Sequence, residues 1–199
     1  MEILYKDENI IVIVKPVGLD SESEVPKALC EEFGSDSEFF TLHRLDKNVG
    51  GVMIYAKNKK TTATLSKAIQ DGKMVKEYLA MVHGTPPESG VLEDLLFKDS
   101  RKNKVFVVKR QRAGVKKAKL EYRRLSEGEE SLVHIRLYTG RSHQIRVQFA
   151  SRGYPLVGDH KYGSRSELNA PMLFSHKITF PYMGKEVSFE AAPDWVSEG

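Results

Sequence analysis

The stretch His43-Arg44-Leu45-Asp46-Lys47-Asn48-Val49-Gly50-Gly51 leads directly into Val52-Met53-Ile54-Tyr55-Ala56-Lys57. The second segment is a short apolar run with strand character. A carboxylate, Asp46, therefore stands just before a diglycine turn and a buried strand. Removing a lone charge from water is costly, so a charged residue beside a buried strand needs a partner or a task. A plain surface turn is the alternative, but a second dense stretch, 137–146, offers a cationic partner and favours a functional site.

The composition indicates an ordinary soluble globular protein. Hydrophobic residues make up 40% and charged residues 29% of the 199 positions, which fit one domain spanning residues 1–199. No run approaches the roughly 20 apolar residues of a membrane helix, and the first residues do not resemble a signal peptide. Cys30 is the only cysteine, so an internal disulfide and a cysteine zinc cluster are excluded. We expect a cytoplasmic protein without membrane attachment.

The net charge of +4 conceals an uneven distribution of charge. Between Arg101 and Arg124 there are eleven Lys or Arg residues against one acid, Glu121, while the rest of the chain carries a net charge of −6. A basic block in an otherwise acidic protein suggests contact with phosphates, because each neutralised phosphate releases counterions. A solvated hairpin without a partner explains the composition equally well.

Hydrophobic periodicity predicts many strands and about three helices. One helix is predicted to start at 23–26 and stop at Gly34, one to span 59–70, and one to run from an N-cap at Ser142 to Ser151. Such a set of strands joined by tight turns indicates an α+β fold on a largely antiparallel sheet. The predicted strands are 3–5, 10–14, 52–57, 76–83, 91–97, 105–109, 119–125, 132–138, 171–180 and 186–191.

Three kinds of chemistry can be tested against the segment that holds Asp46. A kinase catalytic loop is excluded because the acid follows a leucine, Asn48 comes two residues later instead of five, and no glycine-rich phosphate loop or D-F-G occurs. A metal hydrolase is excluded because the six histidines are scattered and form no H-E-x-x-H. A glycosidase needs two carboxylates, and Asp46 is the only acid in a distinctive context.

The chain carries four motifs, at 11–19, at 43–47, at 76–78 with 82–84, and at 137–147 followed by 153–159 and 162–163. In these motifs it resembles the RluA family of pseudouridine synthases, along nearly its whole length. The departure from the family pattern is Val49-Gly50, where members often carry Thr-Ser. The resemblance implies the pseudouridine synthase fold, with a central, mainly antiparallel mixed sheet, a few helices and a catalytic cleft across the sheet. It also implies a catalytic domain alone, without an N-terminal S4-type module.

The reaction implied by the resemblance agrees with what the sequence lacks. Converting uridine to pseudouridine breaks the N1–C1′ bond, turns the uracil and rejoins it through C5. Because this is an isomerisation, no redox cofactor, metal or group donor is required, and we expect no cofactor. A single ionised carboxylate can attack the nucleoside or stabilise a cationic sugar.

The resemblance also implies roles for individual residues. Asp46 is the catalytic carboxylate, and Arg146, in the first turn of the third predicted helix, pairs with it and keeps it ionised. Tyr78 packs on the uracil face and acts in removal of the C5 proton. Arg44 enters the RNA where the target nucleotide has been flipped out, because base chemistry cannot proceed inside the stack.

The remaining candidates lie at the RNA-facing surface. His43 is a candidate beside Arg44, although a lone histidine beside a turn is usually structural and hydrogen-bonds to the backbone. Neither His43 nor His143 is assigned a proton-transfer role. Lys15-Pro16 is expected to shape a turn that lines the pocket. The predicted phosphate contacts are Arg141, Lys109, Arg110, Arg112, Lys116 and Lys117.

Taken together, the sequence predicts a monomeric RNA pseudouridine synthase that acts on a uridine in structured tRNA or rRNA, without an obligatory protein partner. A non-catalytic RNA-binding or RNA-folding protein on the same scaffold is the alternative. A nucleoside hydrolase is a third reading, and it would release free uracil.

Overall fold

The computed structural model describes residues 1–196, which form two compact units. Unit 1 consists of residues 1–76 and the part of the chain from 174 onward, and unit 2 of residues 77–173. The chain enters unit 2 within β5 (Val75–His83) and returns to unit 1 within β10 (Leu173–Tyr182). The prediction of a single domain stays a prediction.

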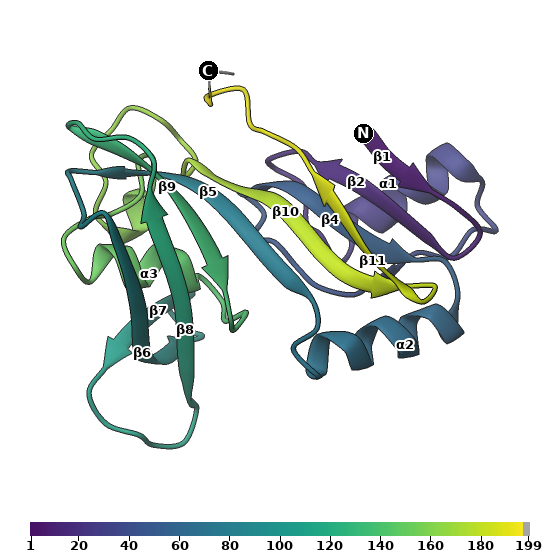
Figure 1. Ribbon diagram of the computed structural model, residues 1–199, viewed down its shortest axis with the longest axis horizontal. Helices are drawn as coiled ribbons and strands as arrows, with labels where there is room; N and C mark the ends of the chain where they lie inside the picture. The colour runs from purple at the N-terminus through teal and green to yellow at the C-terminus, as the bar shows by residue number, and fades with distance from the viewer. Residues whose placement is uncertain (197–199) are drawn as a thin grey trace. The chain divides into compact units, whose positions relative to one another are not determined.

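Unit 1 is a sheet with two helices (Figure 1). Its strand order is β1-β2-β4-β10, with β3 paired to β4 and β11 paired to β10. These pairs are antiparallel except β4 with β10, which is parallel. The elements are β1 (Glu2–Lys6), β2 (Ile10–Lys15), α1 (Glu24–Phe33), β3 (Phe40–Thr41), β4 (Gly50–Ala56), α2 (Lys59–Gln70) and β11 (Lys185–Glu190).

Both faces of the central strands of unit 1 are buried. Ile10 and Val12 of β2 pack in one cluster with Leu65 of α2. Successive strand residues point to opposite faces, so the equally buried Ile11 and Ile13 point to the other face of β2. The predicted helix 59–70 is confirmed, and it begins at an N-cap that the sequence analysis did not identify, Asn58.

Gly51 allows β4 and β10 to approach each other. Its φ is +122°, and a Cβ built on it would clash with the carbonyl oxygen of Ser175, its partner in the parallel register. Gly34, after α1, has a similar φ of +108° but nothing within 4 Å of a built Cβ. Position 51 therefore requires glycine for two reasons, backbone conformation and space, and position 34 for the first alone.

We expect Gly51→Ala to destabilise the protein more than Gly34→Ala. Both variants carry the strain of a positive φ, of order 1–3 kcal/mol, and Gly51→Ala adds a backbone clash worth roughly 1–3 kcal/mol more. Urea unfolding of the two variants measures the difference. Equal losses of stability would show that β4 and β10 do not need this close approach.

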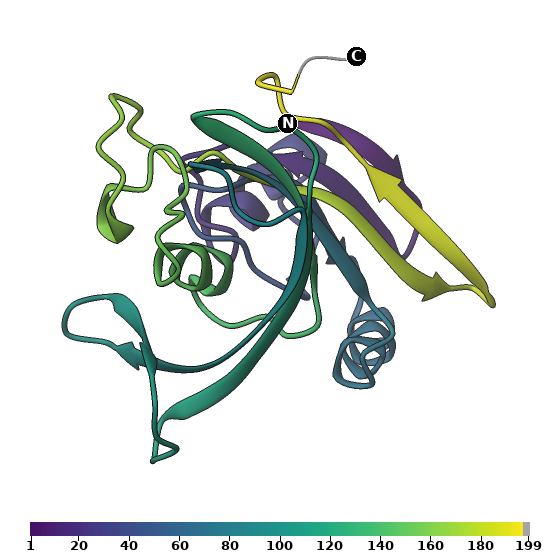
Figure 2. The same ribbon diagram turned by 60° about the vertical axis from the view of Figure 1, so that its left-hand side comes forward.

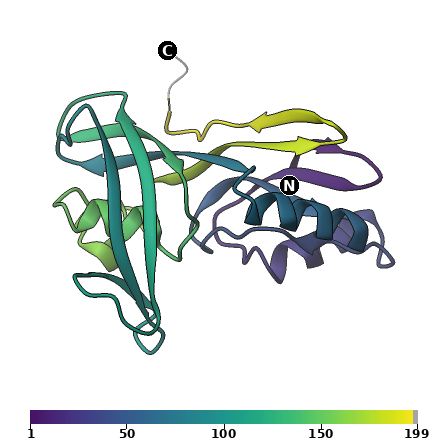
Figure 3. The ribbon, with the colours of Figure 1, turned by 60° about the horizontal axis from the view of Figure 1, so that its bottom comes forward.

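Unit 2 contains a series of hydrogen-bonded strands and one helix. Its strand order is β5-β9-β8-β6-β7, and the pairs β6 with β7, β6 with β8 and β8 with β9 are antiparallel. Figure 2 shows the long β6–β8 ribbon curving strongly, and Figure 3 shows α3 beside the strands. The elements are β6 (Ser89–Asp99), β7 (Lys104–Val108), β8 (Val115–Arg124), β9 (Glu130–Leu137), α3 (Gln144–Ala150) and a 3₁₀ turn, η1 (His160–Tyr162).

The sheet of unit 2 packs one face against α3. Tyr122 of β8 meets Phe149 of α3 edge to face, with ring centroids 5.1 Å apart. Ala118 packs with Val147 in the same layer. The alternate residues of β8 point to the opposite face, and Lys117, Lys119 and Arg123 among them are exposed.

The predicted α+β class with a largely antiparallel sheet is confirmed. The predicted N-cap at Ser142 is wrong: the N-cap is His143, which has a φ of +48° and makes no side-chain capping bond. The two-residue strand β3 was not predicted, because it is too short to show periodicity. No helix within residues 1–196 has the length and apolar character to span a membrane.

Candidate active site

Asp46 lies in a tight turn of unit 1 between β3 and β4. The turn is closed by the Val49 N–H, which donates to the Asp46 carbonyl over 2.9 Å. Val49 is buried, whereas the Asp46 side chain is half-buried. The bond to the buried Val49 therefore fixes the backbone of Asp46 on the side that leads into β4.

A buried lysine holds the same turn from the other side. The Lys15 Nζ donates to the carbonyl oxygens of Pro16, Leu19 and Lys47 at 2.9, 2.8 and 3.3 Å, and the Gly18 N–H donates to Lys47 O over 2.8 Å. Burial lowers the pKa of Lys15 to about 8, and the nearby carboxylates of Asp20 and Asp46 oppose that shift. Sequence analysis predicted a turn at Lys15-Pro16 and missed its hydrogen bonds to the segment after Asp46.

Ser21 forms a second connection between the two loops. Its Oγ donates to the Leu45 carbonyl over 2.9 Å and accepts from the Leu45 N–H over 3.3 Å. The buried Tyr55 hydroxyl donates to the Ser21 carbonyl over 2.8 Å. Backbone atoms on both sides of Asp46 are thus bonded to segment 15–21.

The His43 side chain forms a hydrogen bond with the backbone of β4. Its Nε2 accepts the Ile54 N–H over 3.3 Å, so a neutral ring carries its proton on Nδ1. That Nδ1 is buried and has no hydrogen-bond partner within residues 1–196. Burial, with a smaller contribution from Lys76, lowers the pKa of His43 to about 3. The imidazole is therefore neutral at physiological pH and serves the turn structurally.

This burial makes the stability of the protein depend on pH in the acid range. Between about pH 6.5 and pH 3 the unfolded state binds a proton on His43 that the folded state refuses, so the free energy of unfolding falls as pH falls. His43 alone contributes a slope of about 1.4 kcal/mol per pH unit.

Urea unfolding of wild type and His43→Gln at pH 4.5, 5, 5.5 and 6 measures this contribution. We expect a shallower slope for the variant, because glutamine does not titrate. The interval from pH 7 to 8 is the control, where the two slopes should agree. Identical acid slopes would contradict a neutral buried His43.

Arg44 and Lys47, on either side of Asp46 in the sequence, are exposed and paired with carboxylates. Arg44 Nη1 lies 2.7 Å from Glu22 Oε2, and Lys47 Nζ lies 2.9 Å from Glu24 Oε2. The Asp46 turn therefore presents two cations to solvent, each already in contact with an acid.

In unit 2, Arg146 makes a bidentate ion pair with Asp159. The Nε–Oδ2 and Nη2–Oδ1 distances are 2.6 and 2.8 Å, and the side chains are 9% and 1% exposed. The guanidinium carbon also lies 5.2 Å from the ring centroid of Tyr162. Sequence analysis placed Asp159 in a family motif without a role, and the structure assigns it to orienting Arg146. A pairing of Arg146 with Asp46 joins residues of different units and stays a prediction.

Tyr162 connects α3 to the start of β7. Its hydroxyl accepts the Val105 N–H over 2.9 Å and lies 2.8 Å from Nδ1 of His143. His143 thus contributes to packing at the N-terminus of α3. Tyr78, on β5, is 6% exposed and shares its strand face with Ala80 and Val82, as its alternation predicted. Its contact with uracil stays a prediction.

The predicted phosphate contacts are all exposed, and they lie on two loops and one strand of unit 2. Arg112 lies over the Phe97 ring, 4.7 Å from its centroid, and Arg141 Nε donates to the Lys117 carbonyl over 3.0 Å. Lys109 and Lys117 line a cavity of about 560 Å³ between β6, β7 and β8. Their contact with RNA stays a prediction.

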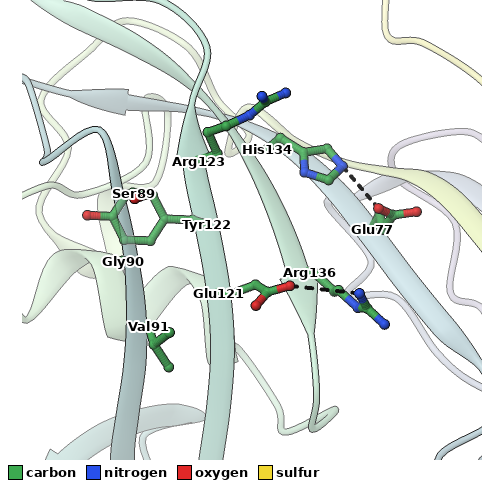
Figure 4. Close-up of a pocket in the computed structure, with 9 residues that line it drawn as sticks. All are labelled: Glu77, Ser89, Gly90, Val91, Glu121, Tyr122, Arg123, His134 and Arg136. Carbon is green, nitrogen blue, oxygen red and sulfur yellow. Dashed lines mark ion pairs between the residues drawn. The ribbon is translucent and has the colours of Figure 1, made fainter.

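A second cavity, of about 410 Å³, lies on the face of unit 2 opposite α3 (Figure 4). Four of its charged or titratable groups pair across strands: His134 with Glu77 at 3.4 Å and Arg136 with Glu121 at 3.9 Å. None of the predicted site residues lines it. Because none of them lines it, this cavity is a poor candidate for the catalytic centre.

Comparison with known proteins identifies the class. Residues 3–151 match the family model described as RNA pseudouridylate synthase, and the chain belongs to this family. It is 33% identical to an uncharacterised RNA pseudouridine synthase from Mycoplasma pneumoniae, over 98% of this chain and 67% of that protein. It is 35% identical to the ribosomal large subunit pseudouridine synthase D of Borreliella burgdorferi, over 81% of this chain and 54% of that protein. The chain thus spans about half to two thirds of these relatives.

Solved structures agree with the family assignment. Human RNA pseudouridylate synthase domain containing 4 is 25% identical and superposes with a TM-score of 0.82, covering 98% of this chain and 89% of the human chain. Human RNA pseudouridylate synthase domain containing 1, at 22% identity and a TM-score of 0.86, shares the fold. The predicted resemblance to the RluA family and its fold is confirmed.

Proposed function

We propose that this protein is an RNA pseudouridine synthase that isomerises a uridine in structured rRNA or tRNA, with Asp46 as its catalytic carboxylate. The observation that carries the proposal is the construction of the Asp46 turn, whose backbone is bonded on both sides to segment 15–21. A fixed backbone suits a carboxylate that must meet one atom of a nucleoside. Family membership supports the same reaction.

In the proposed reaction Asp46 attacks the nucleoside or stabilises the cationic sugar while the N1–C1′ bond breaks. The uracil turns, a C5–C1′ bond forms, C5 loses its proton and N1 gains one, so no other reactant is consumed. Tyr78 packs on the uracil and acts in the loss of the C5 proton. Arg146, oriented by Asp159, keeps Asp46 ionised.

The target uridine must leave the helix before the reaction, and Arg44 occupies the vacated position. The exposed basic residues of segment 101–124 and Arg141 bind phosphates on the flanking RNA. The monomeric protein needs no protein partner and no cofactor for this reaction.

Release of tritium tests the proposal. RNA labelled with tritium at uridine C5 is prepared from a strain that lacks this gene, and wild-type protein should release tritium to water without forming free uracil. Free uracil would instead indicate a nucleoside hydrolase. Tight binding to the RNA without release would overturn the proposal in favour of a non-catalytic RNA-binding protein.

A further inference from the structure

The two cations beside Asp46 are both bound by one short acidic segment. Residues 20–24, which we call the acidic turn, contain three acids: Asp20, Glu22 and Glu24. Glu22 holds Arg44 at 2.7 Å and Glu24 holds Lys47 at 2.9 Å. Two alternate residues of the acidic turn therefore each bind one of the cations that flank Asp46.

The acidic turn is held in shape by its own hydrogen bonds. Asp20 Oδ1 accepts from the Ser23 hydroxyl and from the N–H groups of Glu22 and Ser23, at 2.8, 3.0 and 2.9 Å. The bond from the Ser23 hydroxyl, followed by the Glu22 N–H, lowers the pKa of Asp20. The hydrogen bond from Lys47 likewise lowers the pKa of Glu24.

The acidic turn is also bonded to the segment that carries Arg44. Between Glu22 and Asp20, Ser21 exchanges two hydrogen bonds with the backbone of Leu45, the residue after Arg44. The position of the Glu22 carboxylate beside Arg44 thus follows from the local fold. A chance contact between two long exposed side chains would not require these hydrogen bonds between Ser21 and Leu45.

We propose that the acidic turn competes with RNA for Arg44 and Lys47. In this proposal Glu22 is the residue that weakens the binding of RNA without a target uridine. The inference rests on the proposed function. An RNA that binds Arg44, through a phosphate or at the position left by a flipped nucleotide, must first displace the Glu22 carboxylate. That cost applies to every RNA, but only an RNA that delivers its nucleotide to Asp46 gains further contacts to offset it.

The expected size of the effect is modest because the pair is exposed. The Arg44 and Glu22 side chains are 56% and 55% exposed. Such ion pairs contribute little in water, so release of Arg44 should tighten binding of non-target RNA about two- to fivefold.

Loss of a negative charge alone also strengthens RNA binding, and the experiment separates that effect. Glu22→Gln is compared with Glu38→Gln, an equal change of charge at another exposed position of unit 1. Each is made in wild type and in Arg44→Gln. Gel shifts measure the Kd for an adenosine-only RNA oligonucleotide, and tritium release from C5-labelled RNA measures turnover.

We expect Glu22→Gln to lower the Kd for the adenosine-only RNA about two- to fivefold in the wild-type background and to have no effect beside Arg44→Gln. Glu38→Gln should change the Kd by less than about 1.5-fold in both backgrounds. An equal gain from Glu22→Gln with and without Arg44, or an equal gain from Glu38→Gln, would overturn competition for Arg44. Absence of tritium release by wild type overturns the proposed function, whereas the binding comparison still decides this inference.

Discussion

Asp46→Asn is expected to abolish tritium release from C5-labelled RNA, with a loss on the order of 10⁴-fold or more, because an amide can neither attack the sugar nor balance its positive charge. RNA binding should stay within about twofold of wild type. The half-buried carboxylate lies in a turn whose closing bond uses backbone atoms, so the substitution leaves the Val49 bond in place.

Asp36→Asn is the matched control for this variant. Asp36 is an exposed aspartate of unit 1 in the loop after α1, and its replacement removes the same charge. It should retain wild-type turnover. Turnover by Asp46→Asn within tenfold of wild type would exclude Asp46 as the catalytic carboxylate, whatever the control does.

Much of the fold could be predicted because its segments show clear periodicity. β2 and β4 are apolar runs buried on both faces, and α2 has an amphipathic pattern. β3 could not be predicted, since its two residues pair with β4 only because the β4 edge is available. The N-cap at His143 also escaped prediction, because its left-handed backbone is fixed by tertiary contacts such as the bond to Tyr162.

The sequence indicated which residues are candidates for the site. It gave much less information on the hydrogen-bond and ion-pair partners of these residues. The motifs located Asp46, Tyr78 and Arg146, but hydrogen bonds of Lys15 to three carbonyls leave no signature in a single sequence. The pairing of Arg146 with Asp159 is separated by thirteen residues and by the end of α3. Only the fold brings those two charges together. The predicted catalytic cleft draws on residues of both units and stays a prediction.

Arg146→Met is expected to lower the free energy of unfolding by about 3–5 kcal/mol, because it leaves the carboxylate of Asp159 buried without its cation. Asp159 is 1% exposed, so water cannot replace the guanidinium. The double variant Arg146→Met/Asp159→Asn should recover part of that loss, since a buried amide is less costly than a buried charge.

The ion pair of Arg152 with Asp94, at 2.9 Å, is the matched control in the same unit. The Arg152 side chain is 33% exposed, and Asp94 keeps its hydrogen bond from Gln148 when Arg152 is replaced. Arg152→Met should therefore cost less than about 1 kcal/mol. Urea unfolding of the full chain measures all three variants. If Arg146→Met and the double variant lose the same stability, the buried carboxylate of Asp159 does not depend on Arg146, and Asp159 is not the residue that orients it.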